Sequence, residues 1–106
     1  RGDMGWIDND KSIWFQSEES GYSHIYVTNI SSLKKNVITK GNFEVRDARL
    51  STDEENFYVT LNKMDHGNRN FYHLKWRTKE LVPILEKEYI SLTSTVPISS
   101  SIILVL

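Results

Sequence analysis

The feature that most constrains how this chain can fold is an internal repeat. The segment WIDNDKSIWF at residues 6–15 aligns with LSTDEENFYV at residues 50–59 at a constant shift of 44. In both copies an apolar residue ends one expected strand, a polar and acidic turn follows, and an apolar triplet opens the next strand. The segments HIYV (24–27) and NFYH (70–73) align at a shift of 46, because two extra residues fall in a hairpin turn. A period in the forties built of four short strands is typical of a β-propeller blade, and two copies leave a β-sandwich open as the alternative.

Short aromatic and β-branched stretches alternate with turn-forming residues along most of the chain. Glycine accepts a positive φ without steric cost, and Asp, Asn and Ser side chains bond nearby backbone amides, so such clusters end strands. Helical periodicity is weak before residue 79. The expected strands cover residues 12–17, 24–29, 36–39, 44–51, 56–62 and 69–76.

Composition bounds the functional classes. The 106 residues suffice for one domain or part of one, and the net charge of -1 with no basic tract argues against nucleic-acid binding. The chain has no cysteine, which excludes disulfides, thiolate nucleophiles and cysteine zinc sites. No apolar run approaches the about 18 residues of a membrane helix. The Arg1-Gly2-Asp3 start lacks both an initiator Met and a signal-peptide pattern, which suggests a trimmed sequence. An adhesion role for this tripeptide is the minor alternative.

Blade physics predicts that the chain is incomplete on its own. A propeller blade hides its two faces by stacking on neighbours, so residues 1–78, as about one and a half four-stranded antiparallel blades, would leave apolar faces bare. We therefore expect an all-β fragment that is completed by self-association or by the rest of a longer propeller. Residues 79–106 differ in composition, ending in an aliphatic IILVL, and are expected to form a strand of an atypical blade or to be a non-native extension.

Three motifs in series carry a family resemblance. WFQSEESGYSHIYV (14–27), ITKGNFEV (38–45) and RNFYHLKW (69–76) resemble segments of the N-terminal propeller of dipeptidyl peptidase IV-type serine peptidases, of the prolyl oligopeptidase group. The resemblance covers about residues 6–76, and the tail departs from the family pattern. The matching residues are Ser17, Glu18, Gly21, Tyr22, His24, Ile25, Tyr26, Thr39, Gly41, Phe43, Val45, Arg69, Phe71 and Tyr72.

The resemblance implies a role within a larger enzyme. The parent would release dipeptides from peptide N-termini, with a preference near proline, and would be periplasmic or secreted; the residues alone assign no compartment. The fragment would help to gate access of peptide substrate and would dock on an α/β-hydrolase domain. No Gly-x-Ser-x-Gly elbow occurs in the chain, so we assign it no catalytic, cofactor-binding or metal residues. The rival hypothesis is a non-enzymatic β-rich module that binds a ligand or a protein.

Titratable residues in the repeat are interpreted as structural. Adjacent Glu18 and Glu19 would point to opposite faces of a strand and cannot act as an acid–base pair, and Glu18 is expected to accept hydrogen bonds around the hairpin. His24 is predicted to be a buried, hydrogen-bonded histidine rather than a catalytic base. His66 is expected to be solvated in a turn, and its separation from His73 argues against a metal pair.

Other polar motifs receive the same interpretation. Arg46, Asp47 and Arg49 are expected to mark a strand edge, where exposed ion pairs contribute little. The Asn29 sequon is interpreted as a chance match. Trp6, Trp14 and Trp76 could stack on sugars, but packing in the core is favoured. The aromatic residues expected to form the blade cores are Trp14, Tyr26, Phe57, Tyr58, Phe71 and Tyr72.

Overall fold

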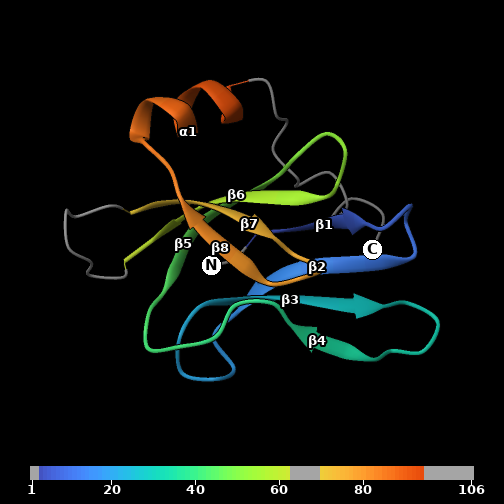
Figure 1. The fold of residues 1–106 in the computed structure, drawn as a ribbon. Coiled ribbons are helices and arrows are strands. Elements are labelled where there is room, and N and C mark those ends of the chain that lie inside the picture. Colours follow the sequence, from blue (N-terminus) through green and yellow to red (C-terminus); the bar gives the residue numbers. More distant parts are fainter. Residues whose placement is uncertain (1–2, 63–69, 95–106) are drawn as a thin grey trace.

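In the computed structural model the described residues, 3–62 and 70–94, form two four-stranded antiparallel sheets and one helix (Figure 1). Within each sheet the strands pair in chain order. Sheet 1 comprises β1 (Met4–Ile7), β2 (Ser12–Ser17), β3 (His24–Asn29) and β4 (Lys35–Val37). Sheet 2 comprises β5 (Val45–Leu50), β6 (Asn56–Leu61), β7 (Phe71–Lys75) and β8 (Glu80–Pro83), and α1 (Glu86–Thr93) follows it.

The predicted all-β architecture of four-stranded antiparallel sheets is confirmed. The strands β2 and β3 have the predicted bounds, and β4 to β7 overlap the predicted strands; residue 69 lies outside the described residues. The repeat predicts a strand that ends at Trp6 without giving its start, and β8 lies in the 79–106 segment, which is expected to be a strand or an extension; both strands are only four residues long. Because β8 completes sheet 2, the expected one and a half blades become two four-stranded sheets.

Strand pairing follows the internal repeat. The β1–β2 and β5–β6 registers are related by the shift of 44, and the β2–β3 and β6–β7 registers by 44 in one strand and 46 in the other. A shift in register by one residue would turn every side chain to the other face, so this agreement fixes equivalent faces. The equivalent pairs are Trp6 with Ile13 and Leu50 with Phe57, then Trp14 with Val27 and Tyr58 with His73.

Each sheet has two faces, which we name from these equivalences. The forward face carries Trp14 in sheet 1 and Tyr58 in sheet 2, and the backward face carries Phe15 in sheet 1 and Val59 in sheet 2. The forward face of sheet 1 packs on the backward face of sheet 2, where the rings of Trp14 and Phe57 meet edge to face at 5.0 Å. Fully burying a large apolar side chain contributes about 1.5–3 kcal/mol, so this junction dominates the stability. Its buried residues include Ile7, Trp14, Ile25, Val27, Leu50, Phe57, Val59, Leu61, Tyr72 and Leu74.

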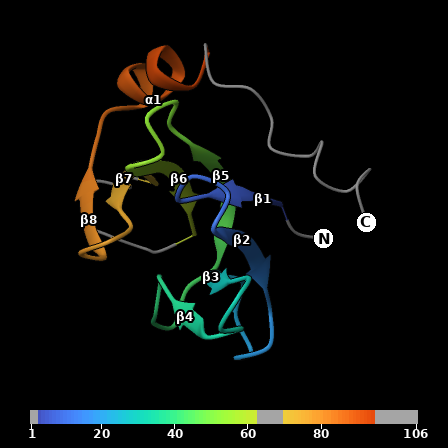
Figure 2. The ribbon, with the colours of Figure 1, turned by 90° about the vertical axis from the view of Figure 1, so that its right-hand side faces the viewer.

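The segments that leave the two sheets begin alike and then diverge. The Ile38 amide donates to the Ile25 carbonyl at 2.8 Å, and the Ile84 amide donates to the Phe71 carbonyl at 2.9 Å, a pair related by the shift of 46. After Ile38 the chain runs directly into β5, whereas after Ile84 it forms α1, which lies beside β6 and β7 at one end of sheet 2 (Figures 1 and 2). The residue pattern of this segment does not predict a helix.

Local interactions explain why α1 forms. The Leu85 amide donates to the Glu88 carboxylate at 3.2 Å, and Glu86 and Glu88 place negative charge in the first turn, where the helix dipole favours it. The Tyr89 ring then packs on Phe71 at 5.0 Å. Of the predicted C-terminal segment 79–106, residues 95–106 lie outside the described residues, and the boundary at 78/79 stays a prediction.

Candidate functional site

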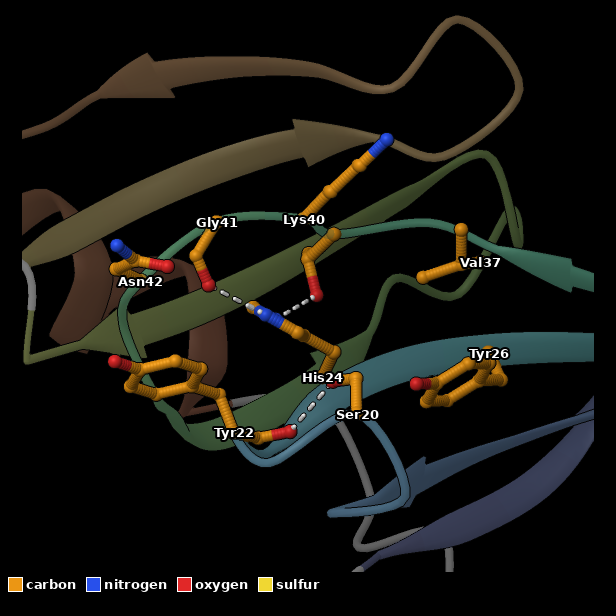
Figure 3. A pocket seen from close by; sticks show the side chains of 9 residues that line it. Ser20, Tyr22, His24, Tyr26, Val37, Lys40, Gly41 and Asn42 are labelled. Atoms are coloured by element: carbon orange, nitrogen blue, oxygen red, sulfur yellow. Dashed lines mark hydrogen bonds between the residues drawn. The ribbon is translucent and has the colours of Figure 1, made fainter.

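An open cavity of about 430 Å³ lies on the backward face of sheet 1, beside the hairpin that joins β2 and β3. Tyr22 and Tyr26 flank it, His24 lies between them, and Val37 closes one side (Figure 3). Ser20, Lys40 and Asn42 supply the polar part of its lining. The strand β3 presents His24 and Tyr26 on one face because alternate residues of a strand share a face.

The imidazole of His24 is fully engaged by the segment that leaves sheet 1. It is 3% exposed, with Nε2 at 2.9 Å from the Gly41 carbonyl oxygen and Nδ1 at 2.9 Å from Thr39 Oγ1. The carbonyl can only accept, so Nε2 carries a proton and donates. The Ile25 amide donates to Thr39 Oγ1 at 3.0 Å, and the Thr39 hydroxyl proton is then free to be donated to Nδ1. The network is complete with a neutral imidazole.

The prediction that His24 is buried and hydrogen-bonded is therefore confirmed, and its partners connect two of the quoted segments. The Phe43 ring packs edge-on against the imidazole at 5.0 Å. Gly41 has φ 138, and a Cβ there would lie 2.7 Å from the Phe43 ring. His24 lies in the segment WFQSEESGYSHIYV (14–27), whereas Thr39, Gly41 and Phe43 lie in the segment ITKGNFEV (38–45). The structure joins them into one unit, which we call the His24 lock: His24, Thr39, Gly41 and Phe43.

Among the described residues, the carboxylate hydrogen bonds at this hairpin are those of Glu19 and not those expected of Glu18. The Glu19 carboxylate accepts hydrogen bonds from Lys35 Nζ at 2.6 Å and from Ser17 Oγ at 3.3 Å. The bond from Lys35 lowers the pKa of Glu19 below its ordinary value. Glu18 takes part in the hairpin through its backbone carbonyl, which accepts a hydrogen bond from the Gly21 amide. Both side chains are exposed, so they do not form a buried acid–base pair.

A second polar cluster ties the hairpin of sheet 1 to the start of β5. Gln16 Nε2 donates to the Val45 carbonyl at 3.0 Å, and the Val45 amide donates to the Ser23 carbonyl at 2.8 Å. The Glu44 carboxylate accepts from the Ser23 amide at 2.8 Å. These bonds fix where β5 enters sheet 2 relative to sheet 1.

At the opposite end of the junction, Arg77 bridges the turns of the two sheets. Its guanidinium lies 3.1 Å from Asp8 in sheet 1 and 3.4 Å from Glu55 in sheet 2, and it stacks over the Trp76 ring at 4.4 Å. Trp76 donates its indole N–H to the Glu54 carbonyl at 2.8 Å. Exposed ion pairs contribute about 0–1 kcal/mol, so this bridge orients the sheets more than it stabilises them.

The remaining polar residues lie apart from the cavity. Arg46 and Asp47 are exposed at a bulge of β5, an edge strand as predicted, where Asp47 exchanges hydrogen bonds with Thr60. His73 stacks on Tyr58 at 5.8 Å, and His66 lies outside the described residues. The Asn29 side chain accepts from the Ser31 and Ser32 amides at 2.9 Å, closing the turn after β3.

The predicted core aromatics fall into two groups. Trp14, Tyr26, Phe57 and Tyr72 are buried as expected. Tyr58 and Phe71 are only partly buried, because they lie on the forward face of sheet 2. Trp76 is buried and Trp6 is partly exposed.

Within residues 3–62 and 70–94, no group of three or more His, Asp or Glu residues is placed to hold a metal ion. No helix in that part of the chain has the length and apolar character needed to cross a membrane.

Comparison with solved structures identifies the fold to which the two sheets belong. The chain aligns with TolB from Acinetobacter baumannii with a TM-score of 0.62 and 21% identity, covering 79% of this chain and 21% of that one. It aligns with oligogalacturonate lyase from Vibrio parahaemolyticus with a TM-score of 0.60 and 19% identity, covering 79% and 22%. Both are β-propellers, so the two sheets have the arrangement of neighbouring propeller blades.

Sequence comparison gives the family. Dipeptidyl peptidase 4 of Trichophyton rubrum is 29% identical over 97 residues, covering 79% of this chain and 12% of that protein. The probable dipeptidyl peptidase 4 of Aspergillus fumigatus is 27% identical over 101 residues, covering 80% and 13%. The chain thus spans about one eighth of the length of these relatives. The family described as the dipeptidyl peptidase IV (DPP IV) N-terminal region matches residues 3–101. The chain belongs to this family.

Proposed function

We propose that this chain is a non-catalytic part of the propeller wall of a serine-type dipeptidyl peptidase. In this role it helps to admit short or unfolded peptides to an active site that other parts of the protein supply. It also contributes to the surface that docks on an α/β-hydrolase domain. The family match over residues 3–101 of a chain one eighth the length of its relatives is the observation that carries the proposal.

The geometry of the cavity supports an architectural role. A catalytic histidine needs a free nitrogen to take up a proton, whereas both nitrogens of His24 are engaged within the fold. The interactions between the sheets serve packing and orientation, through the Trp14–Phe57 contact and the Arg77 bridge.

The test compares the full-length protein with the isolated chain on a Gly-Pro chromogenic substrate. We expect the full-length protein to release the chromophore and the isolated chain to release none. Its gene should also encode a Gly-x-Ser-x-Gly elbow. A full-length protein without this elbow and without turnover would remove the peptidase assignment, and turnover by the isolated chain would contradict the architectural role.

The second candidate is a non-enzymatic binding module, which the open cavity between Tyr22 and Tyr26 favours. The exposed Tyr22 ring beside Lys40 and Asn42 offers stacking and hydrogen bonds to a small ligand. If this candidate is right, the full-length protein lacks peptidase activity but binds a small ligand in the cavity. The substitution Tyr22→Ala should then abolish that binding.

In isolation the chain is proposed to self-associate weakly, because Trp6, Ile13 and Phe15 leave apolar surface partly exposed on one face. Sedimentation over a range of concentrations measures this, and the single substitution Phe15→Lys should shift the population toward monomer.

A further inference from the structure

The turn between β3 and β4 of sheet 1 has the same backbone as the turn between β7 and β8 of sheet 2. The Leu33 amide donates to the Asn29 carbonyl at 2.8 Å, and at a shift of 46 the Lys79 amide donates to the Lys75 carbonyl at 2.6 Å. Leu33 and Lys79 both have a positive φ, of 60 and 68. Because this turn forms with either asparagine or lysine at its first position, its backbone does not require Asn29.

Asn29 nevertheless begins the sequence Asn29-Ile30-Ser31, which is the acceptor pattern for N-linked glycans and the only one in the 106 residues. The residue pattern alone leaves it a chance match, but the structure shows how its side-chain amide is used. Asn29 Oδ1 accepts hydrogen bonds from the Ser31 and Ser32 amides, both at 2.9 Å. Within the described part of the chain, Nδ2 of this asparagine donates none. The turn therefore uses only the carbonyl half of the side-chain amide.

The surroundings of Asn29 have room for an attached sugar. Residues 30–36 are all exposed, and β4 is the edge strand of sheet 1. An open cavity of about 460 Å³ borders the asparagine, and its lining includes the polar side chains of Ser32, Lys34 and Asn36. A monosaccharide unit fits a cavity of this size, and its hydroxyl groups can exchange hydrogen bonds with such side chains.

The same turn exposes two large apolar side chains. Ile30 is 45% exposed and Leu33 is 74% exposed, whereas Trp76, the equivalent of Ile30 in sheet 2, is 7% exposed. In sheet 2 the Arg77 guanidinium stacks over the Trp76 ring. Sheet 1 has Ser31 at the Arg77 position, so Ile30 lacks such a cover. A glycan on the neighbouring asparagine supplies one, because the C–H face of a pyranose ring packs on apolar side chains.

We propose that Asn29 is a glycosylation site, at which the full-length protein carries an N-linked glycan. Nδ2 of Asn29 forms a bond to C1 of an N-acetylglucosamine, which a lipid-linked oligosaccharyl pyrophosphate donates. The C1–O bond to the pyrophosphate breaks, and the lipid pyrophosphate leaves with the bonding electron pair. Nδ2 loses one proton to a base of the transferase. Oδ1 keeps its lone pairs, so both hydrogen bonds that close the turn persist.

The position of the glycan gives it a structural consequence. An edge strand offers unpaired backbone groups to other chains, and a bulky polar group beside β4 prevents such pairing. The glycan also keeps Ile30 and Leu33 out of contacts between molecules. The proposal requires the full-length protein to enter a secretory route, as the family resemblance implies, and it does not rest on peptidase activity.

Peptide mapping of the full-length protein from the cells that produce it is the direct test. Digestion with peptide N-glycosidase in heavy-oxygen water converts a glycosylated asparagine to an aspartate that contains one heavy oxygen atom. We expect this label at Asn29 in most molecules. An unlabelled Asn29 in the protein from these cells would overturn the proposal.

Three variants of the full-length protein, secreted from yeast, separate the acceptor pattern from the turn. Ser31→Ala removes the hydroxyl of the acceptor pattern but keeps the amide that binds Asn29 Oδ1. Asn29→Asp keeps an oxygen acceptor for both amides and removes Nδ2. Ser32→Ala is the matched control, because it removes a neighbouring hydroxyl outside the pattern. We expect Ser31→Ala and Asn29→Asp to lose the glycosidase-sensitive mass of this site completely, and Ser32→Ala to keep it.

A Ser31→Ala protein that keeps the glycan would overturn the proposal. An equal loss of the glycan in Ser32→Ala would show that the acceptor pattern does not decide the modification, and would also overturn it. A full-length protein that carries the glycan at Asn29 but lacks peptidase activity would leave this inference standing while removing the proposed function.

Discussion

Sheet 1 and sheet 2 share a strand order and a register, yet their forward faces differ. Trp14 of sheet 1 is completely buried against sheet 2, whereas its equivalent Tyr58 is partly exposed and stacks on His73. Burial raises the pKa of the Tyr58 hydroxyl above its ordinary value. The repeat therefore specifies the backbone of a blade, while the side chains of each forward face specify which neighbour it accepts.

The segments that leave the two sheets also begin with the same backbone pattern and differ in their side chains. After the shared hydrogen bonds of Ile38 and Ile84, sheet 1 uses the His24 lock to hold an extended chain. In sheet 2 the positions of His24, Thr39 and Gly41 are occupied by Asn70, Leu85 and Lys87, which cannot form this network, and α1 begins instead. The His24 lock therefore holds the chain extended after sheet 1, so that it enters sheet 2 without an intervening helix.

The largest expected effect separates the two forward faces. Trp14→Ala should lower the free energy of unfolding by about 3–5 kcal/mol, because it opens a cavity in the core between the sheets. The equivalent Tyr58→Ala should cost about 1 kcal/mol, since its ring is already partly hydrated. Urea unfolding of both variants measures the difference, and equal losses would mean that the two faces are packed alike.

The next effect separates the two exit segments. His24→Leu leaves the Thr39 hydroxyl and the Gly41 carbonyl without their partner, and should cost about 1–3 kcal/mol. The equivalent Asn70 is exposed, and Asn70→Leu should change the stability by less than about 0.5 kcal/mol. Thermal unfolding of both variants measures the difference in stability. An unchanged stability of His24→Leu would show that the His24 lock is not needed for the fold.

A smaller effect tests whether the lock is closely packed. Gly41 and Gly21 both have a positive φ, but a Cβ at Gly21 meets nothing within 4 Å, whereas at Gly41 it meets the Phe43 ring. Both substitutions to Ala therefore carry backbone strain, and Gly41→Ala should cost about 1 kcal/mol more than Gly21→Ala. Melting temperatures compare them, and a Gly21→Ala loss as large as that of Gly41→Ala would contradict the packing argument.

The smallest effect concerns α1 and depends on pH. Burial raises the pKa of Tyr89 above its ordinary value, with the charge of Asp47 adding to the shift and that of Arg49 opposing it. Because the folded state favours the neutral phenol, this stabilisation is fully present below about pH 10 and is lost as the pH rises through the folded-state pKa. Stability measured from pH 8 to 11 should fall more steeply for the wild type than for Tyr89→Phe. Parallel curves would show that Tyr89 does not hold the helix.

The sequence predicted those features that depend on local chemistry and periodicity. The bounds of β2 and β3, the buried state of His24 and the family resemblance all follow from residues close together in the chain. It gave no bounds for β8 and no helix at α1, because four strand residues and two helical turns are too short for a periodic signal.

The lock partners and the bridge formed by Arg77 were also missed, since they join residues from 15 to 69 positions apart. The Thr39-x-Gly41-x-Phe43 motif was the available signal for the lock. Nothing in the sequence pattern distinguished the covered backward face from the partly exposed one, because both carry the same class of residue.

The most direct test of the whole account is an experimental structure of the full-length protein. We predict that sheet 1 lies between sheet 2 and a further four-stranded sheet in a propeller ring, with Trp6 and Phe15 buried and the catalytic serine supplied by another domain. A structure in which these two residues face solvent, or in which residues 3–84 close into a self-contained unit, would contradict it.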